Sequence, residues 1–203
     1  KVSNNVEERS MWVWMVMATG WAMPPADAAW TVISDAKEKI ECTEQGPITW
    51  CRSTGLVTAD VETVVGSLRD MSKNASRFES ILSIRTLEDN VMHITLDFPG
   101  MLSDRDYVAR YEMQERANGS YALVWTPTTH PNAPHVKGVV RLDDYAGEWR
   151  LEPAGSNTRV TYLWHASYGG SLPNFALPLA RKKTGEEALK DIAVVNGAKV
   201  ISP

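Results

Sequence analysis

The pattern of apolar and polar residues first indicates a helix and then a series of strands. Between residues 58 and 71, apolar side chains recur at helical spacing, at Val61, Val64, Val65, Leu68 and Met71. Thr58 and Asp60 both suit the N-cap of this helix. Beyond Phe78 the period falls from about 3.6 to two, which is the change expected on entering strands.

Strict alternation predicts the strands. It is clearest in 92–97 and 107–114, and further strands are predicted at 121–126, 137–143, 148–151 and 159–165. Asn118-Gly119, a Pro-rich loop at 128–136 and the segment 154–157 separate them. Such alternation is typical of an antiparallel sheet with one face in water.

The segment 172–196 is the second predicted helix, with a charged stretch between its apolar positions Phe175, Leu179, Leu189 and Ile192. An interior Pro costs about 3 kcal/mol and a Gly about 1 kcal/mol relative to Ala. Pro178 and Gly185 therefore predict a kink or a late start near Pro178, and some mobility. We expect this helix to act as a lid.

Strands, one helix, many strands and a final helix follow one another from Trp30, an order that predicts an antiparallel α+β domain.

The chain of 203 residues fits one domain, at 29–203. With 43% hydrophobic residues, 23% charged residues and a net charge of -4, it is an ordinary globular composition. Nucleic acid is not expected as a partner, because there is no basic run. The chain has eight Trp and three Phe, and the large apolar ring of Trp suits the walls of apolar pockets.

Residues 1–28 have the three parts of a secretory signal peptide. Arg9 precedes the uncharged stretch 11–23, and two prolines and the small-residue triplet Ala26-Asp27-Ala28 follow. The alternatives are an N-terminal helix packed on the domain and an uncleaved anchor, although the stretch is shorter than the roughly 20 residues of a membrane span. Cleavage would place the protein in the periplasm or outside the cell; otherwise it would be cytoplasmic.

Cys42 and Cys51 flank a predicted hairpin turn at Gly46-Pro47. Counting outward from the turn brings them opposite each other, within reach of a cross-strand disulfide. Two buried free thiols are the alternative. A zinc site is not expected, since no second ligand pair lies nearby.

No motif points securely to catalysis. Adjacent strand residues Asp104, Arg105 and Asp106 face opposite sides, so we interpret them as a structural ion-pair cluster. His130 and His135 lack metal-ligand partners, and His93 and His165 fall on the outer face by strand parity. We expect neither a metal nor a cofactor.

Several blocks of sequence occur in an order that resembles a known family. They are Trp30, Ser103-Asp104-Arg105-Asp106-Tyr107-Val108, His130-Pro131 to Pro134 with Lys137-Gly138-Val139-Val140-Arg141, Trp149 with Leu151 and Pro153, 158–164 with Gly169-Gly170, and Leu172-Pro173. Together they resemble the steroidogenic acute regulatory protein related lipid transfer (START) domain, of bacterial type, in the helix-grip superfamily.

The resemblance implies a helix-grip fold, in which a curved antiparallel sheet wraps around a long C-terminal helix and encloses a hydrophobic cavity for one lipid. It also implies that the 128–136 loop and the last helix form a gate, at His130, Pro131, Pro134, Phe175 and Leu179. The partners expected of such a monomer are a lipid or other hydrophobic small molecule and, transiently, a membrane.

Strand parity assigns the ligand-binding positions on the concave face. They are Met92, Ile94, Leu96, Tyr107, Tyr111, Tyr121, Leu123, Trp125, Val140, Leu142, Trp149, Leu151, Tyr162 and Trp164. Any one of them is about as often plain core as ligand wall.

One departure from the family concerns the ligand. Sterol-binding members place a charged pair inside the tunnel, and the matching positions here lie near Met92 and Tyr111. A phenol replaces the arginine, so the tunnel is more apolar and its anchor is a hydroxyl. This replacement argues against a sterol.

The sequence thus favours a carrier that moves a lipid between membranes. The first alternative is an enzyme resembling polyketide cyclases and aromatases, which would need several polar groups inside the same cavity. The second is a ligand sensor, which would need an exposed apolar surface that changes with ligand.

Overall fold

A computed structural model describes residues 23–35, 38–98, 102–169, 172 and 176–201. Residues 1–22 of the predicted signal peptide lie outside the described residues. Phe175 of the predicted gate also lies outside them.

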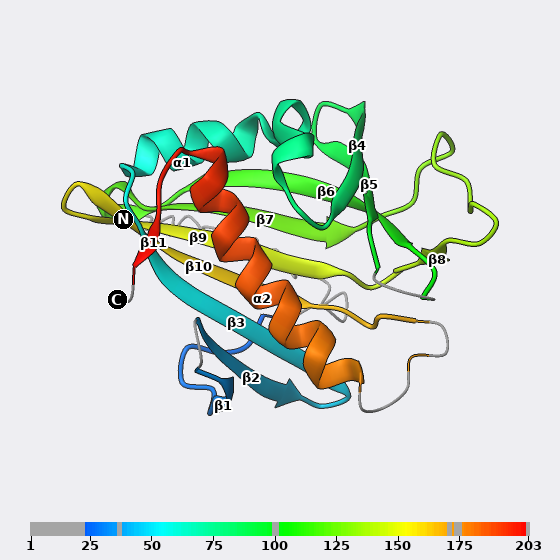
Figure 1. Cartoon of the computed structure of the whole chain (residues 1–203), viewed down its shortest axis with the longest axis horizontal. Coiled ribbons are helices and arrows are strands. Elements are labelled where there is room, and N and C mark those ends of the chain that lie inside the picture. The colour runs from blue at the N-terminus through cyan, green and yellow to red at the C-terminus, as the bar shows by residue number, and fades with distance from the viewer. Residues whose placement is uncertain (1–22, 36–37, 99–101, 170–171, 173–175, 202–203) are drawn as a thin grey trace, which may run out of the picture.

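The described strands form one large curved sheet (Figure 1) in the order β1-β2-β3-β10-β9-β7-β6-β5-β4, with β8 paired in parallel to β6 and β11 paired to β3. Their bounds are β1 (Thr31–Ser34), β2 (Lys39–Gln45), β3 (Ile48–Val57), β4 (Ile81–Glu88), β5 (Val91–Leu96), β6 (Arg105–Glu115), β7 (Tyr121–Pro127), β8 (Val140–Arg141), β9 (Ala146–Ala154), β10 (Asn157–His165) and β11 (Val200–Ile201). The expected antiparallel α+β architecture and helix-grip arrangement are confirmed.

The two predicted helices are present, as α1 (Val61–Arg69) and α2 (Ala176–Val195), together with the short 3-10 helices η1 (Met71–Arg77) and η2 (Ala117–Gly119). Asp60 is the N-cap of α1, and its carboxylate accepts a hydrogen bond from the Thr63 backbone N–H at 3.0 Å. Pro178 lies in the first turn of α2, where a missing N–H costs no helical hydrogen bond.

α2 crosses the concave face of the sheet diagonally (Figure 1) and packs tightly on it at Gly185. A Cβ at this position would lie 2.9 Å from the Trp164 ring and 3.0 Å from Ile40. The Ser53 hydroxyl also donates to the Gly185 carbonyl at 3.1 Å. Gly185 therefore brings the helix close to the sheet, whereas the sequence suggested a weak point in the helix.

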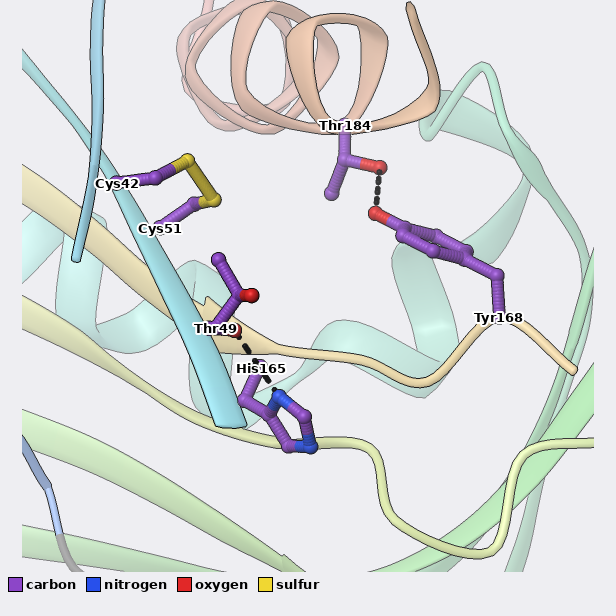
Figure 2. Close-up of a disulfide and its surroundings, with 6 residues drawn as sticks. All are labelled: Cys42, Thr49, Cys51, His165, Tyr168 and Thr184. Carbon is purple, nitrogen blue, oxygen red and sulfur yellow. Dashed lines mark hydrogen bonds between the residues drawn. A yellow bond between two sulfur atoms is a disulfide. The ribbon is translucent and has the colours of Figure 1, made fainter. Parts of the chain in front are cut away.

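The Gly46-Pro47 turn joins β2 and β3 as predicted, and Gly46 adopts a positive φ of 61°. Cys42 and Cys51 are paired across these strands and joined by a disulfide, with their Cα atoms 4.1 Å apart (Figure 2). The disulfide belongs to the main core beneath α2.

The outer face of the sheet is drier than the alternation predicted. Trp50 and Leu163 form an apolar cluster there, with Met23 and Trp30 packed against it. A second cluster of Val91, Val108 and Ala133 lies where the 128–136 loop folds onto β5 and β6. Loops thus cover outward positions that a strand pattern alone assigns to water.

Two strand predictions differ from the structure. The strand expected at 137–143 is only β8, because Gly138 has a positive φ of 85° and Val136 to Val139 form a turn. β4 was not predicted, because its pairing with β5 shifts register between Ile81 and Ser83 and again between Thr86 and Glu88, which breaks the period of two.

Candidate ligand-binding site

A cavity of about 280 Å³ lies between the concave face of the sheet and α2. Ligand pockets commonly enclose about 300–1,000 Å³ and are lined mostly by apolar side chains. This cavity is therefore just below that range, and its lining is mainly aromatic and aliphatic.

The cavity takes its sheet wall from part of the predicted concave set. Its members there are Leu96, Tyr107, Tyr111, Trp125, Leu142, Trp149 and Tyr162. The rest of the set lies elsewhere. Ile94, Leu123, Leu151 and Trp164 are buried in the core, Met92 and Tyr121 pack partly buried against it, and Val140 is partly buried in β8. Alternation identified the residues that point inward, but it could not separate those that line the cavity from those that pack in the core.

Sequence reasoning missed two tyrosines of the wall, Tyr145 and Tyr168. Tyr145 precedes β9 by one residue and shares the parity of Trp149, so extending that strand by parity would have found it. Tyr168 follows β10 in a loop, where no period applies; its hydroxyl is 3.1 Å from that of Thr184 on α2 (Figure 2).

Apart from Leu179, which was predicted as a gate residue, the helix wall was also missed. It consists of Ala176, Leu179, Ala180, Lys183, Thr184, Glu187, Ala188 and Asp191, which recur at helical spacing. Because half of these side chains are polar or charged, the sequence of this stripe looks like a solvated face. Further lining comes from η1 and neighbouring loops, at Met71, Phe78, Ser80, Ile81, Asp97, Phe98, Leu102 and Leu172.

Four buried tyrosine hydroxyls meet in two pairs on the sheet side. The hydroxyls of Tyr107 and Tyr111 are 3.1 Å apart, and those of Tyr145 and Tyr162 are 2.5 Å apart. Burial raises the pKa of all four phenols above the ordinary value, so they are uncharged at neutral pH.

Trp125 lies between these pairs. Its ring stacks on Tyr162 and Tyr111, with centroid distances of 5.5 and 6.2 Å. The Trp125 indole nitrogen is buried and has no hydrogen-bond partner among the described residues. The stacking fixes a rigid aromatic floor that carries a small number of polar groups.

Asp191 places a carboxyl on the helix wall, although its side chain is only 4% exposed. Burial raises its pKa to about 6, while a hydrogen bond from the Glu79 backbone N–H, at 3.0 Å, opposes the shift. On the same wall Lys183 is 3.3 Å from Glu187, so its charge is already paired.

The predicted gate residues are divided between two sides of the sheet. Leu179 lines the cavity and is 62% exposed, as expected at a mouth. His130, Pro131 and Pro134 do not line the cavity. Their loop lies on the outer face, where Arg141 donates to the Pro134 carbonyl and the His130 Nε2 is 3.3 Å from a Glu88 oxygen.

The residues of the 104–106 cluster bond to other parts of the structure and not to one another. The Asp106 carboxylate, buried on the outer face, accepts two hydrogen bonds from Arg141 at 2.8 Å and lies 2.7 Å from His93 Nε2. Arg105 lies over the Phe98 ring, 4.1 Å from its centroid. His165 also lies outside the cavity, with its Nδ1 3.0 Å from the Thr49 carbonyl (Figure 2).

Among the described residues, no three His, Cys, Asp or Glu side chains are grouped so that they could hold a metal ion. Within the same part of the chain, no helix is both long and apolar enough to cross a membrane.

Comparison with known proteins gives a match between residues 7–192 and the family model of the START domain. An uncharacterised protein of Pseudomonas aeruginosa is 28% identical over 126 residues, 59% of this chain and 61% of that protein. The phosphatidylcholine transfer protein of Bos taurus is 23% identical over 108 residues, 51% of each chain. The chain thus spans between half and two thirds of the length of these curated relatives.

A solved structure supports the fold. The STAR-related lipid transfer protein of Xanthomonas axonopodis aligns with a TM-score of 0.71 at 24% identity, covering 83% of this chain and 98% of that one. At this identity the likeness concerns the fold.

Proposed function

The chain belongs to the START domain family, a family of lipid and hydrophobic-ligand binding, and we propose that it holds one largely apolar molecule beneath α2 and carries it between membranes. The observation that carries the proposal is the cavity, whose sheet wall is built from Tyr107, Tyr111, Trp125, Trp149 and Tyr162. Binding to such a surface gains about 25 cal/mol of free energy for each Å² of apolar ligand surface that leaves water.

The size of the cavity limits the cargo. A volume of about 280 Å³ suits a single chain or a compact ring system. A lipid with two long chains would require α2 to move away from the sheet, and the hydrogen bond from the Ser53 hydroxyl to the Gly185 carbonyl opposes that movement.

The mouth of the cavity supports a transient membrane contact. Leu179 exposes most of its side chain there, and a leucine on a bilayer surface would bury that area in lipid. We propose that the monomer docks through this end of α2 when it exchanges its ligand.

The disulfide supports an oxidising location. Bonds such as that between Cys42 and Cys51 persist in the periplasm or outside the cell and are rare in the cytosol. We therefore propose that the protein works in the periplasm or is secreted.

A vesicle transfer assay tests the proposal. Donor vesicles carry a fluorescent single-chain lipid, acceptor vesicles carry none, and transfer is followed with and without the protein. The variant Ala180→Trp fills the cavity and should abolish the added transfer. Val194→Trp is the matched control, because Val194 is exposed on the same helix and outside the lining. Equal transfer by both variants would contradict the proposal.

A cyclase-like enzyme is the second candidate, favoured by the hydroxyl pairs Tyr107–Tyr111 and Tyr145–Tyr162 in the cavity. Such an enzyme needs polar groups that act on a bound polyketide. Turnover by the purified protein of the linear precursor of an aromatic polyketide would favour the enzyme over the carrier, if Tyr145→Phe/Tyr162→Phe abolished it.

A further inference from the structure

The sheet side of the cavity holds more hydrogen-bond donors than the protein satisfies. Four tyrosine hydroxyls carry four protons, and each hydroxyl can donate one. The Tyr107–Tyr111 bond uses one proton and the Tyr145–Tyr162 bond uses another. One proton in each pair is left without an acceptor among the hydrogen bonds of the described residues.

Trp125 lies in the same floor, between the two hydroxyl pairs. Its indole N–H is buried and unpartnered within the described part of the chain, and an indole nitrogen can only donate. Trp125 is 2% exposed and stacks on Tyr111 and Tyr162, one member of each hydroxyl pair. Buried donors without acceptors are costly, so the spare hydroxyl protons of the two tyrosine pairs favour a guest that accepts hydrogen bonds.

The charges around the cavity indicate that the acceptor is uncharged. The charged side chains in its described lining are Asp97, Glu187, Asp191 and Lys183, and the lysine is paired with Glu187. An anionic guest would meet carboxylates without a free cation to balance it, at a high cost in a dry site. An uncharged oxygen would meet no such opposition.

We propose that the ligand is an uncharged, mainly apolar molecule whose inner end carries a carbonyl oxygen, as in a ketone or ester, held by the hydroxyl pairs Tyr107–Tyr111 and Tyr145–Tyr162. This inference rests on the proposed function, because it names the chemical class of the molecule carried. It excludes plain hydrocarbons and free fatty acids as preferred ligands.

Three probes of equal length test the inference: 2-tridecanone, tridecane and tridecanoate at pH 8. Each is titrated against the protein loaded with the uncharged dye Nile red, and displacement gives its affinity. With hydrogen bonds worth about 0.5–1.5 kcal/mol each, the ketone should bind roughly tenfold more tightly than the alkane. It should also bind at least tenfold more tightly than the carboxylate.

Variants test whether the tyrosine hydroxyls cause the preference for the ketone. Tyr107→Phe/Tyr111→Phe and Tyr145→Phe/Tyr162→Phe keep the rings and remove both hydroxyls of a pair, and each should reduce the ketone preference about threefold while alkane affinity is unchanged or higher. Tyr121→Phe is the matched control, because the Tyr121 hydroxyl donates to Glu62 and lies outside the lining. Thermal unfolding checks that each variant is folded.

The outcomes separate the inference from the proposed function. Equal displacement by ketone and alkane, or tighter binding of the carboxylate, would overturn the inference and leave the carrier intact. If Nile red does not bind and no probe is taken up by other means, such as native mass spectrometry, the proposed function fails as well.

Discussion

The backbone of Gly147 lies directly against the indole ring of Trp125. A Cβ at Gly147 would be 2.3 Å from the Cζ2 atom of the ring, far inside van der Waals contact. Glycine at this position of β9 therefore lets Trp125 lie flat between Tyr111 and Tyr162 and so leaves the cavity open.

Gly147→Ala should push Trp125 into the cavity and also strain β10, because the Cβ would lie 2.3 Å from the Leu163 carbonyl oxygen. We expect a loss of about 1–3 kcal/mol in the free energy of unfolding, as for other overpacked cores, and a loss of Nile red binding. Urea unfolding and dye titration measure the two effects. Gly66→Ala in α1 is the control, since a Cβ there meets nothing within 4 Å and should stabilise the helix by up to about 1 kcal/mol. Unchanged dye affinity in Gly147→Ala would show that Trp125 does not control access.

Reduction of the Cys42–Cys51 disulfide should lower the free energy of unfolding by about 2–3 kcal/mol, because the bond closes a loop in the unfolded chain between two residues with a sequence separation of 9. Urea unfolding with and without dithiothreitol measures the difference. The double variant Cys42→Ala/Cys51→Ala should match the reduced protein and should not respond to dithiothreitol. A wild-type protein equally stable in both conditions would show that the thiols are not joined in solution.

Asp191→Asn should stabilise the protein at neutral pH. Because burial raises the folded-state pKa of Asp191 to about 6, above its unfolded value, the charged form is disfavoured in the fold. The stability of the wild type should therefore fall as pH rises from about 4 to 6, whereas asparagine keeps the acceptor for the Glu79 N–H and removes this loss.

The gain from Asp191→Asn should be on the order of 2 kcal/mol at pH 7 and should vanish near pH 4. Unfolding of both proteins at several pH values measures it. A difference that stays constant across this range would contradict the raised pKa.

Asp106→Asn should have the opposite pH dependence. Burial alone would raise the pKa of Asp106, but hydrogen bonds from Arg141 and His93 and their charges hold it below the ordinary value. The stabilisation is present above the unfolded pKa and is lost as pH falls through the folded one. The variant should lose about 3 kcal/mol at pH 7, with Arg141 left unpaired, and the loss should shrink below pH 4. Comparison of urea midpoints at pH 7 and pH 3.5 checks this.

The sequence predicted the elements best where a period was sustained. Val61, Val64, Val65 and Leu68 identified α1, and alternation placed Tyr107, Tyr111 and Tyr162 on the inner face. These predictions worked because burial on one face imposes the period directly.

The wall of the cavity was predictable only in part. Alternation cannot distinguish Trp149, which lines the cavity, from Leu151, which packs in the core, because both point inward. Asp191 and Thr184 belong to a stripe of α2, half of it polar, that looks solvated until the helix is placed over the sheet. The sequence of the 128–136 loop has no period that could place it. Arg141 binds the buried Asp106 and also donates to the Ala133 carbonyl of this loop, and these contacts on the outer face are evident only in three dimensions.

The central claim is that the cavity beneath α2 holds one hydrophobic guest. Native mass spectrometry of the protein after exposure to a bacterial lipid extract, compared with Ala180→Trp, tests this claim most directly. We predict one bound, uncharged molecule per wild-type chain and none on the variant. A wild-type chain that remains free of ligand at every lipid concentration would contradict the account.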